Sequence, residues 1–123
     1  MQEKYGSLMD SIIYMPKLWY KNEDIKGYVK EFEEAIKPYA YEILFNSEEA
    51  STLKIIPKIK NHNNTFLAIA LWDELVARYT DEKALAEGPY EAWGWLISKG
   101  ANTIMTDRPE ELLDYLRRKK LHD

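Results

Sequence analysis

The chain has 123 residues, of which 46% are hydrophobic and 31% are charged, a composition typical of one folded soluble domain. Its acidic and basic residues are interleaved and sum to a net charge of −4, which argues against the basic surface that a nucleic-acid-binding domain requires. The absence of cysteine excludes disulfides, thiolate nucleophiles and cysteine-ligated metals.

The first predicted strand covers residues 11–15, which are β-branched and aromatic and are followed by Pro16. Residues 18–20 are then expected in a loop, where Trp19 and Tyr20 either pack as a lid over the core or offer a stacking surface to a ligand. Packing is the commoner use of such an aromatic pair.

A helix is expected next, capped by Asn22 or Asp24 and ended by Pro38. The second strand covers residues 40–45 and contains one carboxylate, Glu42. A glutamate in an otherwise apolar strand is either paired or at an exposed end, or it serves a ligand or metal, because an unpaired buried charge is costly. The sequence leaves both interpretations of Glu42 open.

A short or kinked helix follows, since Pro57 interrupts its apolar pattern. His62 lies in an asparagine-rich stretch without a partner at ligand spacing, and is expected to be an exposed loop residue. Residues 65–72 are nearly all apolar, which is typical of a parallel strand buried on both faces. Trp72 and Asp73 stand where this strand should emerge.

Residues 78–89 are polar and contain a Gly-Pro break, so we expect a long loop of the kind that often covers a site. A helix is predicted over residues 90–99, with Gly100 at its C-terminal cap. Residues 102–106 predict the fourth strand, after which Asp107 can cap the last helix.

Four strands that are each followed by a helix predict four consecutive βα units with a parallel sheet, in a single domain of residues 1–123. A closed (βα)8 TIM barrel needs about 250 residues, so the chain has the length of half of one. An open flavodoxin-like sheet is the alternative. In both folds ligands bind at the carboxyl ends of the strands, which makes the following residues candidates for a substrate pocket: Glu42, Trp72, Asp73 and Asp107.

Three segments near the end of the chain, residues 93–97, 100–109 and 112–116, resemble the C-terminal end of the glycerophosphodiester phosphodiesterase family. The most specific match is the Thr-Asp-Arg-Pro sequence at residues 106–109. Three earlier segments are similar to the second half of that family: residues 14–16, 71–73 and 81–84. The resemblance implies a TIM-barrel phosphoric diester hydrolase that uses a divalent cation, Ca²⁺ or Mg²⁺, to convert glycerophosphodiesters into glycerol 3-phosphate and an alcohol.

In that family the catalytic histidines and the metal-binding carboxylates belong to the N-terminal half, and this sequence contains no His-Arg-Gly. The resemblance therefore implies no catalytic residue, metal ligand or cofactor in this chain, and no hydrolysis by the chain alone. The sequence also departs from the family's pattern at four positions. It has Leu44 where the family has lysine and Ile69 where the family has asparagine. It has Ala77 and Arg78 where the family has glycines.

Two hypotheses follow. In the first, the chain is the C-terminal half of a glycerophosphodiesterase-like barrel, and a complementary half-barrel supplies the catalytic groups. In the second, it is a non-catalytic half-barrel that self-associates or binds a small ligand, because exposed strand edges favour pairing with another chain. We expect no nucleic-acid partner, and we expect a soluble chain, since no apolar run reaches the roughly 20 residues of a membrane span and no secretory signal is recognisable.

Overall fold

The computed structural model describes residues 15–36, 38–61 and 65–122. The strands are β1 (Lys17–Leu18), β2 (Ala40–Ile43), β3 (Thr65–Ile69) and β4 (Thr103–Met105). The helices are α2 (Ile25–Ala35), α3 (Ser51–Lys54), α4 (Ile56–Asn61), α5 (Asp81–Glu87), α6 (Trp93–Ser98) and α7 (Pro109–Arg118), with the 3-10 turns η1 (Asp73–Leu75) and η2 (Pro89–Glu91). His62 and positions 11–14 of the first predicted strand lie outside the described residues.

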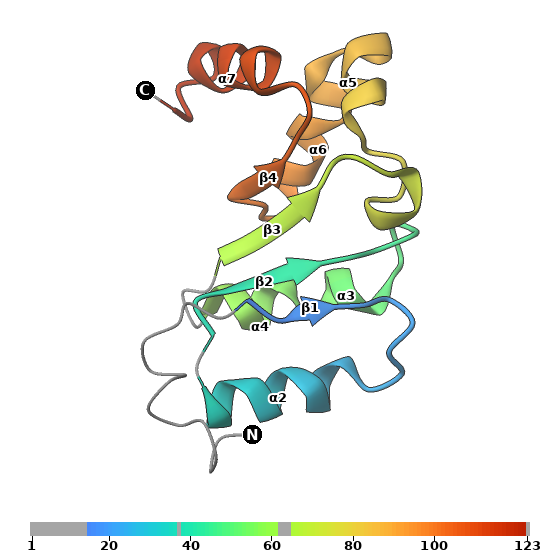
Figure 1. The fold of residues 1–123 in the computed structure, drawn as a ribbon, viewed down its shortest axis with the longest axis vertical. Coiled ribbons are helices and arrows are strands. Elements are labelled where there is room, and N and C mark those ends of the chain that lie inside the picture. The colour runs from blue at the N-terminus through green and yellow to red at the C-terminus, as the bar shows by residue number, and fades with distance from the viewer. Residues whose placement is uncertain (1–14, 37, 62–64, 123) are drawn as a thin grey trace.

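The four strands form one sheet in the order β1-β2-β3-β4, and every neighbouring pair is parallel (Figure 1). At least one helix separates each strand from the next. The predicted succession of βα units in a parallel sheet is therefore confirmed.

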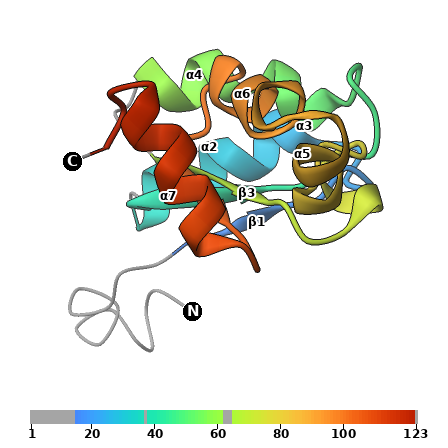
Figure 2. The same ribbon diagram turned by 90° about the horizontal axis from the view of Figure 1, so that it is seen from above.

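One face of the sheet carries the hydrophobic core. Alternate strand residues point to this face, and with helix side chains they form one buried cluster that includes Tyr41, Ile43, Phe66 and Ala68. Figure 2 shows α2, α3, α4 and α6 together on a single side of the sheet. The sequence predicted burial of the third strand on both faces. Among the described residues, the helices bury the strand on the core face. On the opposite face, Leu67 and Ile69 are also buried.

Local signals explain several helix ends. The Asp24 carboxylate accepts a hydrogen bond from the Gly27 backbone N–H at 3.1 Å, so Asp24 is the cap of α2. The next helical segment is split into α3 and α4 around Ile55, close to Pro57, as the sequence predicted. Gly100 has a φ of 112° immediately after α6, which confirms the predicted helix end.

Two predicted loops contain regular structure instead. Leu18 was expected in a loop but belongs to β1, because the Pro16 carbonyl accepts a hydrogen bond from the Glu42 N–H at 2.9 Å and so carries the pairing past the proline. The polar stretch at 78–89 contains helix α5, which Thr80 caps by accepting a hydrogen bond from the Lys83 N–H at 3.4 Å. The prediction of a long covering loop is therefore wrong.

The turn after η1 holds two residues in the left-handed region, Ala77 with a φ of 49° and Arg78 with a φ of 73°. The Ala77 N–H donates to the Phe45 carbonyl, and the Arg78 N–H donates to the Asp73 carbonyl, both at 2.9 Å. These bonds keep the turn in a conformation that glycine adopts without steric cost. They are also two positions at which the sequence departs from a glycine pattern.

We expect Arg78→Gly to raise the free energy of unfolding by about 0.5–1 kcal/mol, because it removes the left-handed strain at a small entropic cost. Arg78 is exposed, so little packing is lost. Urea unfolding measures the change, with Arg78→Ala as the control that loses the side chain but keeps the strain. A glycine variant no more stable than the alanine variant would contradict the explanation.

Candidate functional site

A row of four side chains crosses the sheet on the face opposite the helices. The strand register aligns Lys17 with Glu42, Glu42 with Leu67, and Leu67 with Thr103. The Lys17 ammonium lies 3.8 Å from a Glu42 carboxylate oxygen, and the two side chains are 50% and 14% exposed, respectively. Glu42 thus has the ion-pair partner that one of its two interpretations requires, in a position that still faces away from the helices.

The next row towards the carboxyl ends of the strands is apolar. Leu44 and Ile69 are 0% and 4% exposed, whereas Met105, paired in register with Ile69, is 44% exposed. Trp19, just beyond the end of β1, is 37% exposed, and its ring stacks on Tyr20 with centroids 5.8 Å apart. This face therefore changes from a charged pair to apolar side chains within two residues along each strand.

The two candidates at the end of β3 point away from the folded core. Trp72 is 54% exposed in extended backbone immediately before η1. Asp73 is exposed as well, and its backbone carbonyl holds the Arg78 turn. The predicted strand included Trp72, but β3 ends at Ile69, so both residues lie beyond the strand.

The best-connected carboxylate at this edge is Asp81, which the sequence placed in a loop. Asp81 is 6% exposed and accepts hydrogen bonds from the Trp93 indole N–H at 2.8 Å, from the Thr106 hydroxyl at 2.9 Å and from the Asp107 N–H at 2.8 Å. Its own N–H donates to the Ala70 carbonyl at 2.9 Å. Asp81 therefore joins the ends of β3 and β4 to helices α5 and α6. Its position directly after Thr80, a typical cap residue, is the sequence signal that could have placed it at a helix start.

Asp107 is exposed and does not cap the last helix, so that prediction is wrong. Helix α7 begins at Pro109 with Arg108 in the cap position, and the Arg108 N–H donates to the Thr106 hydroxyl at 2.8 Å. Proline at the first helical position sets this start, since its fixed φ suits the first turn and it needs no hydrogen-bond acceptor.

Asp107 instead borders a polar pocket of about 290 Å³ at the carboxyl ends of β3 and β4. The pocket is lined by Ala70, Leu71, Asp81, Glu82, Leu85, Asp107 and Arg108. Of the four sequence candidates, the structure thus brings Asp107 to a pocket wall. Glu42 lies on the face opposite the described helices, and Trp72 and Asp73 lie on the surface beyond β3.

A stack of aromatic rings and ammonium groups lies nearby on the helix side. Tyr79 and Trp95 are parallel, with ring centroids 3.7 Å apart, and Lys83 and Lys99 lie 5.1 and 5.2 Å from the respective ring centroids. The Tyr79 hydroxyl donates to the Glu48 carboxylate. Burial, together with this hydrogen bond, raises the pKa of Tyr79 to about 12.

Because an unfolded tyrosine ionises near pH 10, the elevated pKa of Tyr79 stabilises the fold below pH 10, and this contribution is lost as the pH rises towards 12. An alkaline titration followed by tyrosinate absorbance counts the phenols that ionise well above pH 10. We expect Tyr79→Phe to lower that number by one. Tyr90→Phe, at an exposed position, is the control. Loss of a phenol that ionises near pH 10 in the Tyr79 variant would contradict the assignment.

The described part of the chain contains no cluster of three or more histidine, cysteine or acidic side chains arranged to hold a metal ion. Within the same residues, none of the helices combines the length and the hydropathy needed to cross a bilayer.

Comparison with known proteins identifies a family. The search of curated proteins finds no match to the chain. A family model described as a domain of unknown function, DUF4996, matches residues 14–116, which is most of the chain. The chain therefore belongs to the DUF4996 family of domains of unknown function.

Proposed function

We propose that this chain is one half of a (βα)8 barrel of the glycerophosphodiester phosphodiesterase type. In this proposal it shapes part of the substrate pocket, and it does not hydrolyse the diester alone. The observation that carries the proposal is an all-parallel, four-stranded sheet on which Lys17 and Glu42 form an ion pair, on the face opposite the described helices.

The arrangement of helices favours half a barrel over a flavodoxin-like sheet. Doubly wound sheets carry helices on both faces, whereas a barrel carries them only on the outside. The described helices that cover this sheet gather on one side of it (Figure 2). In a barrel, the strand side chains that point away from the helices fill the interior, and the row from Lys17 to Thr103 lies on that face of the sheet.

The chemistry of this row suits an anionic ligand. A phosphodiester and a phosphate monoester both carry negative charge, and Lys17 offers a half-exposed ammonium group as a point charge for it. Glu42 holds that ammonium group on the inner face and is within reach of a cation that a complementary half could bring. Diester hydrolysis also needs an acid and base pair, and this sequence supplies no His-Arg-Gly for it, so the proposal assigns that chemistry to the complementary half.

Two assays test the proposal. We expect the purified chain to release no glycerol 3-phosphate from glycerophosphocholine in the presence of Ca²⁺ or Mg²⁺. We expect glycerol 3-phosphate itself to bind in a calorimetric titration, and Lys17→Ala to weaken this binding by at least about fivefold, which corresponds to ~1 kcal/mol. Lys26→Ala, which removes an exposed ammonium group on α2, is the control.

Each assay addresses a different part of the proposal. Turnover by the chain alone would refute the division of labour between two halves. Absence of glycerol 3-phosphate binding, or equal loss of binding in the Lys17 and Lys26 variants, would refute a phosphate site at Lys17.

A further inference from the structure

Two ammonium groups flank the indole ring of Trp19, directly after the strand that carries Lys17. The Lys17 Nζ lies 5.8 Å from the centroid of this ring, and the Lys21 Nζ lies 5.6 Å from it. Both distances are within the range of a cation–π contact. The carboxyl end of β1 therefore combines one partly exposed aromatic ring with two positive charges.

Strand alternation and a tight turn bring these three side chains together. Lys17 and Trp19 are two residues apart at the end of β1, a spacing that places both side chains on one face of a sheet. The Asn22 N–H then donates to the Trp19 carbonyl at 2.9 Å, which closes a four-residue turn that contains Lys21. The backbone at the end of the strand thus returns Lys21 to the Trp19 ring.

Part of this positive charge has a carboxylate partner. Glu42 lies 3.8 Å from the Lys17 ammonium group. Lys21 is exposed, and within the described ranges no carboxylate lies at ion-pair distance from it. The nearby Asp24 carboxylate accepts the capping hydrogen bond of α2. The surplus positive charge beside Trp19 therefore comes mainly from Lys21.

The accessible part of this face lies at β1. Leu44, Leu67 and Ile69 are buried in the single chain, whereas the Lys17 side chain is 50% exposed and Trp19 is 37% exposed. A phosphate bound by Lys17 must therefore approach from the β1 side. The alcohol that is bonded to this phosphate then lies beside Trp19 and Lys21.

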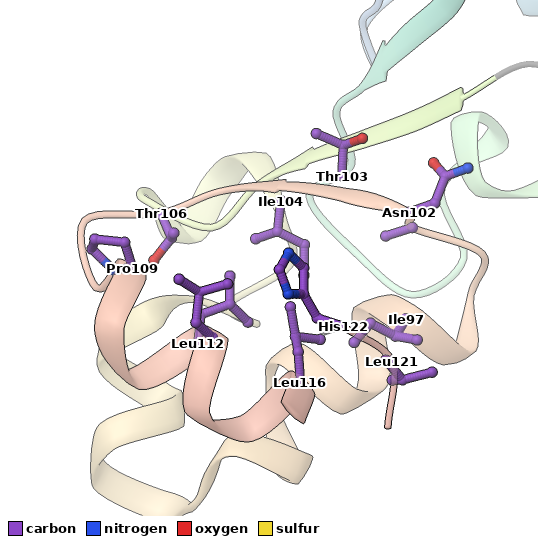
Figure 3. A pocket seen from close by; sticks show the side chains of 12 residues that line it. Ile97, Asn102, Thr103, Ile104, Thr106, Pro109, Leu112, Leu116, Leu121 and His122 are labelled. Atoms are coloured by element: carbon purple, nitrogen blue, oxygen red, sulfur yellow. The ribbon is translucent and has the colours of Figure 1, made fainter. Parts of the chain in front are cut away.

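The cavities near β4 lie too far away to bind this alcohol. The larger, of about 570 Å³, lies between β4 and α7, and Ile104, Leu112 and Leu116 point into it (Figure 3). The polar pocket bordered by Asp107 lies at the ends of β3 and β4. Since neighbouring strands are about 4.8 Å apart, β3 is about 10 Å from β1. Recognition of the alcohol therefore falls to the end of β1.

An indole ring at such a position usually favours a quaternary ammonium group, because its π face attracts cations. Here the ammonium groups of Lys17 and Lys21 already make that contact, and they repel a further cation. An uncharged polyol meets no such repulsion. Its hydroxyl oxygens can accept hydrogen bonds from the Lys21 ammonium group, which is a donor only.

We infer that the end of β1 selects the alcohol part of the diester, excluding cationic head groups such as choline and accepting uncharged polyols such as glycerol. This inference rests on the proposed function, because it takes the phosphate to bind at Lys17. It makes Lys21 the residue that determines head-group specificity. Trp19 positions the Lys21 ammonium group through the cation–π contact.

Calorimetric titration of the purified chain with two diesters tests the inference. Glycerophosphoglycerol and glycerophosphocholine share the glycerol phosphate part, and only the second carries a quaternary ammonium group. We expect glycerophosphoglycerol to bind at least about fivefold more tightly, which corresponds to ~1 kcal/mol. Both diesters also enter the turnover assay of the proposed function, so that exclusion of choline is not mistaken for a lack of catalysis.

Variants of Lys21 assign the preference to this residue. Lys21→Ala is expected to reduce the preference to less than about twofold, and Lys21→Glu to reverse it, because a carboxylate attracts the quaternary ammonium group. Lys26→Ala removes an exposed ammonium group from α2 and should retain the full preference. Both positions are exposed, so the variants should keep the circular dichroism spectrum of the original chain.

Three results would overturn the inference and leave the proposed function standing. These are equal binding of the two diesters, an equal preference in the Lys21→Ala and Lys26→Ala variants, and a loss of glycerophosphocholine binding in Trp19→Leu, which would show that the ring itself binds choline. Binding of neither diester and no binding of glycerol 3-phosphate would refute the proposed function, and the inference with it.

Discussion

Asp81→Ala is expected to lower the free energy of unfolding by about 3 kcal/mol, because it leaves several buried or half-buried donors without their acceptor. The Trp93 indole N–H lies in the core, where its side chain is 1% exposed, and cannot turn to water. The Thr106 hydroxyl and the Asp107 N–H lose the same carboxylate. Each orphaned donor costs about 1–3 kcal/mol when solvent does not replace the bond, and partial hydration near Asp107 moderates the sum.

Urea unfolding followed by circular dichroism measures this loss at a fixed protein concentration. Asp81→Asn keeps one carbonyl oxygen for Trp93 but presents an amide donor to the Asp107 N–H, so we expect roughly half the effect. Glu82→Ala removes an exposed neighbouring carboxylate and should change the free energy of unfolding by less than about 0.5 kcal/mol. An Asp81→Ala variant as stable as Glu82→Ala would show that the carboxylate does not hold the two strand ends together.

The alternation of strands and helices was predictable because it depends on local signals. Apolar runs mark β2, β3 and β4, and Asp24 and Gly100 mark helix ends through hydrogen-bonding and backbone preferences within a few residues. The position of β1 was not predictable in this way. Lys17–Leu18 is a strand only because it pairs with β2. The partner of each residue lies 25 positions further along the chain.

The same distinction explains the site. Asp81 meets Trp93 and Thr106, which lie 12 and 25 residues further along the chain, so no local pattern reveals the cluster. The Lys17–Glu42 pair likewise follows from strand register, which the sequence alone did not fix to the residue. Helix α5 has a local signal, because Thr80 is a typical cap residue directly before it. The prediction of a loop followed instead the polar composition and the Gly-Pro break at the end of the helix.

The two faces of the sheet differ in the exposure of their side chains. Side chains on the core face, such as Ile43 and Phe66, are committed to packing and are 0% exposed. Lys17, Thr103 and Met105 lie on the opposite face and are exposed. Substitutions at these exposed positions and at the buried core positions should therefore separate binding from stability, because they act on different sets of contacts.

Phe45→Ala is expected to lower the free energy of unfolding by about 3–5 kcal/mol, the cost of removing a fully buried aromatic side chain. Phe45, two residues after β2, is 0% exposed, and its ring lies 5.9 Å from the Trp95 ring at an angle of 41°. Its backbone also pairs with the segment after η1, donating to the Leu75 carbonyl at 3.0 Å. The cavity left by alanine would lie between the sheet, this segment and α6, where several elements hold the backbone and collapse is restricted.

Thermal and urea unfolding should rank three variants. Phe45→Leu keeps most of the volume and is expected to cost less than about 1.5 kcal/mol, so the difference between leucine and alanine isolates the cavity. Met105→Ala, on the opposite face, should leave the unfolding of the isolated chain within about 0.5 kcal/mol of the original, because its side chain is exposed there. If Met105→Ala proved as costly as Phe45→Ala, Met105 would be buried in solution, and the face opposite the helices would already be covered in the species being unfolded.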